Sequence, residues 1–438
     1  MDPGGWKIRR SKRLSSVSST ADGDLSREQK SWRYRIFAST WLCYAGLYFC
    51  RKPFYIVKGA LSDELGFDAT SLGLIGTAYL VAYMLGQFIT GVAGSRWGPR
   101  LVLLLGMAIS IGVSASFGFA NNMPTFLVLM TLNGFAQATG WACSVGTMAN
   151  WFRRSERGRV MGIWATNFQV GGVLANTLAA FVLGAYGFRY SFLAGSAVLA
   201  LVWLFFLFNQ RNCPGDLGLA AIVEDESGSD VSTKGPVISR AVWTNVLLVG
   251  GFYFFVKFIR YALWSWTPFF LNKNYGLQGD DAGYLSTLFD LAGIAGVIVT
   301  GFLSDKVFKS RRAGVSLLMM VALMISCLLM TWLGTLSVPV FAVCLAMVGF
   351  TLYGPDALMT GAAAMDIGSR RGATLAAGVI NGMGSAGSVV QELVIGRMYD
   401  SGGGSLEPIF ALLLGSSIMA TLVMAVMVVR NRMGKIQV

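Results

Sequence analysis

The chain has 438 residues, of which 54% are hydrophobic and only 13% are charged, and its formal net charge is +13. A soluble domain is about a quarter charged, whereas a membrane-spanning helix needs roughly 20 mostly apolar residues. The composition therefore excludes a soluble enzyme, and its continuous apolar runs disfavour an outer-membrane barrel, whose strands alternate apolar and polar residues.

Twelve apolar segments follow one another along the chain. The first six lie at 34–57, 71–93, 101–120, 124–149, 160–184 and 190–209, and the other six at 242–271, 283–303, 313–334, 338–365, 373–396 and 408–430. A polar linker at 210–241 separates the two sets. We therefore predict an all-α membrane protein of twelve transmembrane helices in two pseudo-symmetric six-helix bundles, 34–209 and 242–430. We expect a disordered basic tail at 1–33 and a short tail at 431–438.

Most Lys and Arg residues lie in the two tails and in alternate loops between the predicted helices. The opposite loops contain only Lys58, Arg189, Lys273 and Arg397. Positive loops resist translocation, so we predict that both termini are cytoplasmic. The cell inner membrane is the expected location, or an organelle membrane if the chain is eukaryotic. Because the cations are spread over these loops, we expect no nucleic-acid partner.

Cationic and aromatic residues recur with helical spacing in the first and seventh segments. The first set is Tyr44, Tyr48, Arg51 and Tyr55, and the second is Tyr253, Lys257, Arg260 and Trp264. Positions i, i+4, i+7 and i+11 share one face of a helix. A charge at the bilayer centre costs at least ~2.5–3.5 kcal/mol, so it should face a cavity or a partner. We predict that both sets face a central site, where Arg suits phosphate or carboxylate recognition.

Acidic residues within the predicted helices all belong to the second half. They are Asp290, Asp356, Asp366 and Glu392. The first half of the site is therefore cationic, which predicts an anionic substrate. Asp290 and Asp366 are candidate charge partners or coupling groups, while the roles of Asp356, Glu392 and Lys52 stay open. Lys52 points about 100° away from Arg51 on a regular helix and could snorkel or support it.

The chain has no His, and its six cysteines lack metal-type spacing. No nucleophile, base and orienting group can be assembled from the remaining residue types. We therefore predict that the protein is not an enzyme and uses no metal or cofactor.

Several motifs resemble one known family when they are taken together and in order. They are YxxRKPF ending at Phe54, NGFAQATGW ending at Trp141, ERGRVMGIW ending at Trp164, RYALWSWTP from Arg260 to Pro268, and LYGPDAL beginning at Leu352. Over about 32–430 the chain resembles the organophosphate:phosphate antiporters of the major facilitator superfamily. The resemblance implies the major facilitator fold and exchange of a sugar phosphate or glycerol 3-phosphate for inorganic phosphate, by a monomer in the lipid bilayer.

The resemblance also implies roles for individual residues. Arg51 and Arg260 would bind phosphate, one from each half, and Lys257 would join them. The cavity would be lined by Tyr44, Tyr48, Gln137, Trp141 and Tyr353. The sequence departs from the bacterial exchangers at Gln87, where they have Lys, and at Phe168, where they have His. Lys257 likewise replaces a Tyr of the bacterial glycerol-phosphate carriers, so the organic part of the substrate stays open.

Three other interpretations remain. A proton-coupled carboxylate symporter would use the same arginines, with Asp290 or Asp366 carrying the proton, and a pH gradient alone would drive its uptake. A nitrate-type carrier would use paired arginines for a small oxyanion. A transporter-like sensor would bind a sugar phosphate without moving it across the membrane.

Overall fold

The structure is a computed structural model, and it describes residues 25–153, 160–161, 163–164, 166–220, 222, 240–303, 312–359 and 373–433. All regular secondary structure in these residues is helical. The first half contains α1 (Arg27–Leu47), η1 (Tyr48–Cys50), α2 (Lys52–Ile56), α3 (Lys58–Leu65), α4 (Ala69–Trp97), α5 (Pro99–Phe117), α6 (Met123–Trp151), α8 (Thr166–Tyr186) and α9 (Phe188–Asn209). After η2 (Pro214–Leu217), the second half contains α10 (Arg240–Lys273), α11 (Gly279–Phe302), α12 (Arg312–Leu333), α13 (Val338–Ala357), α15 (Ala373–Ser401) and α16 (Glu407–Arg432).

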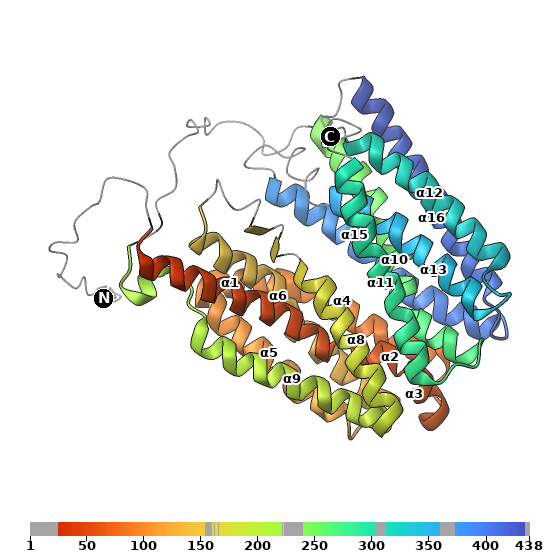
Figure 1. Cartoon of the computed structure of the whole chain (residues 1–438), viewed down its shortest axis with the longest axis horizontal. Helices are drawn as coiled ribbons and strands as arrows, with labels where there is room; N and C mark the ends of the chain where they lie inside the picture. The colour runs from red at the N-terminus through yellow and green to blue at the C-terminus, as the bar shows by residue number, and fades with distance from the viewer. Residues whose placement is uncertain are drawn as a thin grey trace, which may run out of the picture.

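The helices pack as two groups, α1 to α9 and α10 to α16 (Figure 1). In the first group α6 packs against α4 and α5, and α9 packs against α5 and α8. In the second, α10 packs against α15 and α16, and α11 against α13. Figure 1 shows the groups converging where α2 and α3 lie and diverging toward the start of α1 and the end of α16. The residue boundaries of the two bundles remain predictions, because most of the linker lies outside the described residues.

The first segment is not the single helix that we predicted at 34–57. α1 already begins at Arg27, because Ser26 and Gln29 form a capping box. Residues 27–33, which we assigned to a disordered tail, are therefore helical. The α-helix then stops at Leu47, and a 3-10 turn leads into α2. Pro53 favours this break because it has no backbone N–H to donate.

Nine of the described helices are long and apolar enough to cross a membrane, by length and composition: α4, α5, α8, α9, α10, α11, α12, α13 and α16. Of the other three predicted spans, 34–57 is divided by the break after Leu47 and is not one continuous helix. The helices α6 and α15, which cover 124–149 and 373–396, carry the buried polar residues Gln137 and Glu392.

Glycines produce the same close contact in both bundles. A Cβ at Gly171 of α8 would lie 2.7 Å from the Ala45 Cα, and one at Gly387 of α15 would lie 2.2 Å from the Phe254 carbonyl oxygen. Helix backbones approach this closely only where no side chain intervenes. Ala45 and Phe254 each stand six residues before the arginine of their helix. The match supports pseudo-symmetric placement of the two arginines.

Polar contacts between the bundles gather where α2 and α3 lie. Asp400, at the end of α15, accepts hydrogen bonds from the backbone nitrogens of Ala69 at 3.2 Å and Thr70 at 2.6 Å, at the start of α4. Lys273, the last residue of α10, forms an ion pair with Asp63 of α3. We call this region, formed by α3, the start of α4 and the ends of α10 and α15, the closed end.

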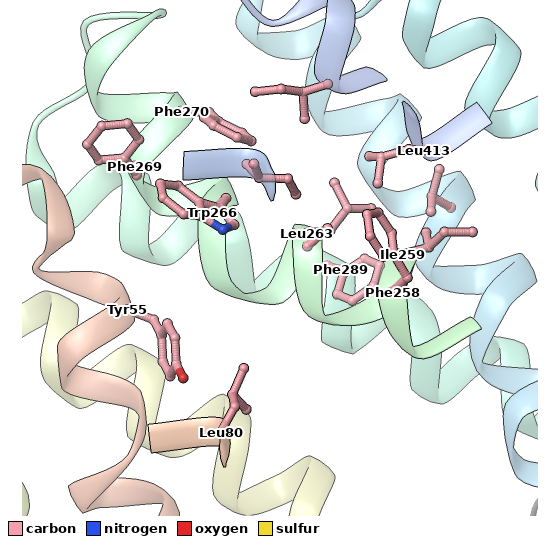
Figure 2. Packing of buried hydrophobic residues seen from close by; sticks show 14 of the residues in the cluster. Tyr55, Leu80, Phe258, Ile259, Leu263, Trp266, Phe269, Phe270, Phe289 and Leu413 are labelled. Atoms are coloured by element: carbon pink, nitrogen blue, oxygen red, sulfur yellow. The ribbon is translucent and has the colours of Figure 1, made fainter. Parts of the chain in front are cut away.

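One hydrophobic core cluster extends across both bundles. Figure 2 shows part of it, with Tyr55 and Leu80 from the first bundle and Trp266, Phe269 and Phe270 from α10. The Tyr55 ring centroid lies 4.5 Å from that of Trp264, also on α10. This packing joins the helix that carries Arg51 to the helix that carries Arg260, so a movement of one bundle must disturb it.

Candidate functional site

Arg51 lies in the break of the first helix, between η1 and α2, and is 7% exposed. Its Nε donates a hydrogen bond to Gln137 Oε1 of α6 at 2.8 Å. Among the described residues no carboxylate lies within ion-pair distance of Arg51, and its buried Nη2 has no hydrogen-bond partner. A buried charge without such partners is costly. The free edge of the guanidinium is therefore a ready site for an anion.

Gln137 supports both the helix break and Arg51. Its amide nitrogen donates to the Leu47 carbonyl at 3.0 Å, at the point where the regular helix ends. Asn133, one turn earlier on α6, donates to the Cys50 carbonyl at 2.8 Å. Carbonyls at a helix end need partners of this kind. The two α6 amides thus stabilise the break, and Gln137 also fixes the orientation of Arg51.

Three tyrosine rings surround the Arg51 guanidinium. Its Cζ lies 4.7 Å from the Tyr48 ring centroid, 5.0 Å from that of Tyr83 and 5.8 Å from that of Tyr79. Aromatic faces attract a cation without neutralising it. Tyr79 also donates its hydroxyl to Gln137 Oε1 at 3.1 Å. The rings therefore stabilise the charge and leave it able to bind an anion.

Arg260 of α10, in contrast, has a carboxylate partner. Its Nη1 lies 2.8 Å from Asp356 Oδ2 of α13, and 19% of the arginine side chain is exposed. Its Cζ lies 4.6 Å from the Tyr353 ring centroid and 5.6 Å from that of Phe168, on α8 of the other bundle. The structure thus assigns Asp356, whose role the sequence left open, to Arg260. An anion at Arg260 must share it with Asp356 or displace that carboxylate.

A chain of contacts links the surroundings of the two arginines. Tyr353 lies against Arg260 and donates to Asp290, which pairs with Lys52, the residue after Arg51. Because Arg51 comes from the first bundle and Arg260 from the second, an anion held by both would connect the bundles.

Lys52 crosses from the first bundle to the second. Its Nζ lies 3.5 Å from Asp290 Oδ2 of α11 and 3.7 Å from the Trp264 ring of α10. The Tyr353 hydroxyl donates to the other oxygen of Asp290. Lys52 is 1% exposed, so it does not snorkel to the interface. It neutralises Asp290 instead and leaves Arg51 without competition from that carboxylate.

Lys257 of α10 contacts neutral groups of α15. Its Nζ donates to Asn381 Oδ1 at 2.9 Å and to Ser385 Oγ at 3.3 Å. Asn381 Nδ2 in turn lies 3.5 Å from Gln87 Oε1 of α4, in the first bundle. Gln87 and Lys257, two positions where the sequence departs from the bacterial exchangers, therefore meet at Asn381.

Lys58 does not lie in a loop, as we expected, but is fully buried at the closed end. Its Nζ lies 2.6 Å from Glu392 Oε1 of α15 and 2.9 Å from Ser265 Oγ of α10. Ser265 donates to the same carboxylate, and so does the Gln391 amide at 2.9 Å. This ion pair joins the two bundles, and its groups must separate if the closed end opens.

The remaining predicted site residues lie at the edge of this arrangement or outside it. Tyr44 is buried, with its ring centroid 5.6 Å from that of Trp141 and 5.7 Å from that of Trp164. Trp141 is 39% exposed. Asp366 lies outside the described residues, so its role as a coupling group remains a proposal.

Sequence reasoning missed several residues of the site. Tyr79 and Tyr83 face Arg51 from α4, and Asn381 and Ser385 face Lys257 from α15. Their only signal in the sequence is that they are polar residues within apolar segments, and such residues are common in these helices. Lys58 carried a clearer signal, because it follows Tyr55 by only three residues in an apolar run.

Comparisons with known proteins agree with this geometry. A family model for the Major Facilitator Superfamily matches residues 40–392. The chain is 30% identical over 427 residues to the glycerol-3-phosphate transporter of Bacillus subtilis, covering 92% of this chain and 94% of that protein. The chain belongs to the organophosphate:phosphate antiporter family of this superfamily.

Other relatives are consistent with membership of the antiporter family. The chain is 27% identical over 413 residues to the probable hexose phosphate transport protein of Chlamydia trachomatis, covering 88% of this chain and 90% of that protein. Among solved structures, a bacterial homologue of the human lysosomal transporter Spinster, inward-facing and occupied, matches with a TM-score of 0.71 at 15% identity, over 94% of this chain and 100% of that one. At this identity the likeness shows the fold alone.

Membership of the antiporter family makes the chain a multi-pass membrane transporter and not an enzyme. The site agrees with that role, since it offers a cation with an unused edge and a second cation whose partner can be exchanged.

Proposed function

We propose that the chain exchanges an organic phosphate ester, a sugar phosphate or glycerol 3-phosphate, for inorganic phosphate by alternating access. The observation that carries the proposal is the free edge of Arg51. Gln137 holds Nε, while Nη2 is buried without a hydrogen-bond partner among the described residues. A planar guanidinium edge matches two oxygens of a phosphate. The names of the two bacterial relatives support a phosphate ester as the second substrate.

Arg260 would bind the same phosphate from the second bundle. Each charge-assisted hydrogen bond contributes about 1.5–3 kcal/mol, so a dianion can join or displace Asp356. Tyr48 lies beside the Arg51 guanidinium and can donate its hydroxyl hydrogen to a remaining phosphate oxygen. A ligand shifts a conformational equilibrium only through its different affinity for the two states. A phosphate that contacts both bundles favours the state in which they are closest.

The same charges make the empty carrier slow to reorient. Two arginines at ~10 Å repel each other by roughly 1.7 kcal/mol at an effective dielectric of ~20. Asp356 offsets part of this repulsion, and a bound dianion reverses it. The loaded carrier therefore changes conformation readily, and one phosphate compound is exchanged for another without ATP.

We place both termini in the cytoplasm, following the distribution of Lys and Arg in the loops. The end opposite the closed end then opens to the cytoplasm. The transporter would work as a monomer without a cofactor in the cell inner membrane, or in an organelle membrane of a eukaryote. Transport to the other side requires the ion pairs Lys58–Glu392 and Lys273–Asp63 to break.

Reconstitution tests this function directly. We expect liposomes that contain the purified chain and labelled inorganic phosphate to release label only when external phosphate or a phosphate ester is present. Equal release into plain buffer would indicate a uniporter. Uptake driven by a pH gradient alone would indicate a proton-coupled symporter, and ligand binding without flux would indicate a sensor.

A further inference from the structure

We propose that Lys257, Asn381 and Ser385, which we call the lysine subsite, bind a second anionic group of the organic substrate. The preferred ester is then a short phosphorylated carboxylic acid rather than a phosphorylated polyol. This inference rests on the proposed function and names the class of ester carried.

The lysine subsite is built to hold an ammonium group in one place. Lys257 is 7% exposed, and its Nζ contacts Asn381 Oδ1 at 2.9 Å and Ser385 Oγ at 3.3 Å. A Cβ at Gly384 would lie 3.0 Å from Lys257 Cδ and 2.5 Å from Tyr253 Cδ1, so the glycine leaves room for the lysine stem. Two of the three ammonium hydrogens have partners, and the third can serve a ligand.

Lys257 differs from two other buried lysines, Lys52 and Lys58, because each of those has a carboxylate partner. Lys52 lies 3.5 Å from Asp290, and Lys58 lies 2.6 Å from Glu392. Lys257 has only an amide and a hydroxyl as hydrogen-bond partners, and no described carboxylate lies within ion-pair distance of it. Neutral dipoles offset the desolvation of a buried charge only in part. Lys257 is therefore the lysine that gains most from an anionic ligand.

The position of Lys257 suits a second group on the same small molecule. Lys257 precedes Arg260 by three residues on α10, so the two side chains lie on one face about one turn apart, roughly 5 Å along the axis. Its electrostatic neighbours are Asp356 and Arg260. A phosphate at Arg51 and Arg260 would thus place a carboxylate two or three bonds away from its ester oxygen near Lys257.

The lysine subsite also reaches the first bundle. Asn381 Nδ2 lies 3.5 Å from Gln87 Oε1 of α4, so a carboxylate at Lys257 sits beside amides of both bundles. A polyol would leave the Lys257 charge offset only in part, by the amide and the hydroxyl that it contacts. A carboxylate would neutralise it and could accept hydrogen bonds from the two amides.

Two esters with the same three-carbon chain test the proposal. Glycerol 3-phosphate ends in a hydroxymethyl group, and 3-phosphoglycerate ends in a carboxylate. Both are used to inhibit uptake of labelled phosphate into phosphate-loaded liposomes. In the wild type we expect 3-phosphoglycerate to inhibit at about tenfold lower concentration than glycerol 3-phosphate. In Lys257→Gln we expect the ratio of these two inhibitory concentrations to fall to about one. Lys30→Gln, at an exposed position of α1, is the control and should keep the wild-type ratio.

The ratio of the two inhibitory concentrations distinguishes failure of the lysine subsite from failure of the proposed exchange function. Equal inhibition by the two esters in the wild type, or a ratio that survives in Lys257→Gln, would overturn the lysine subsite. Failure of the wild type to take up labelled phosphate would instead overturn the exchange function. Thermal stabilisation of the purified protein, titrated with each ester, compares the concentrations at which the two esters bind and requires no transport. Ser385→Ala, which keeps the Lys257 charge, should reduce the ratio about threefold, and no change would count against the subsite.

Discussion

Arg51 and Gln137 are joined by a 2.8 Å hydrogen bond that uses the Nε of the guanidinium. The bond orients the arginine so that Nη2 is buried and available, while the Gln137 amide nitrogen supports the helix break at Leu47. The α6 helix thus positions the binding group by holding an interruption in another helix. A ligand that needs the fork of Arg51 depends on this contact.

Gln137→Glu should strongly weaken phosphate binding while keeping the shape of the side chain. The new carboxylate would neutralise Arg51 and compete with phosphate, so we expect at least about a 30-fold weaker Kd. Isothermal titration with inorganic phosphate measures this. Gln29→Glu is the matched control, because it makes the same change at a residue that contacts Ser26 and Ala220, outside the site. Wild-type affinity in Gln137→Glu would show that phosphate binds elsewhere.

Asp356→Asn should tighten phosphate binding and slow exchange. It removes the carboxylate that lies 2.8 Å from Arg260 and competes with the ligand. We expect Kd for phosphate to fall by about tenfold and turnover to fall with it, because release becomes slower. Titration and exchange rates on the same preparation measure both. Weaker binding in this variant would mean that Asp356 orients Arg260 for phosphate and does not compete.

Breaking the pair Lys58–Glu392 should open the closed end. Removing one partner of a buried ion pair costs about 3–5 kcal/mol, so Glu392→Gln should favour conformations in which Lys58 reaches water. A cysteine at Ala69, which is 2% exposed, reports this by its rate of labelling, with the partly exposed Cys213 replaced.

The double variant Lys58→Met, Glu392→Leu provides the control for this experiment. It removes both charges and fills the space with apolar groups, a replacement that often changes the free energy of unfolding little. We expect its labelling rate to return toward that of the parent. Equal labelling in the single variant, the double variant and the parent would show that the pair does not hold the closed end.

Much of the fold could be predicted because the apolar segments are long and the linker is clear. The break in the first helix could not, since it depends on Gln137 and Asn133, which lie more than 80 residues away in sequence.

The site was predictable in its cations and not in their partners. Helical spacing marked Arg51, Lys257 and Arg260, and the structure gives each of them a polar partner on another helix of its own bundle. Four acids were available to pair with them, and spacing alone could not choose among them. The structure pairs Asp356 with Arg260, Asp290 with Lys52 of α2, and Glu392 with Lys58 of α3.

The fork of Arg51 is the central element of the proposed mechanism, and Arg51→Lys tests it most directly. The change keeps the charge and removes the planar fork. We measure homoexchange of labelled phosphate in liposomes, with Arg189→Lys as control, because Arg189 donates to Gly118 and Asn121 outside the site. We predict exchange at least about 100-fold below wild type for Arg51→Lys and near wild type for the control. Near-normal exchange by Arg51→Lys would contradict the mechanism.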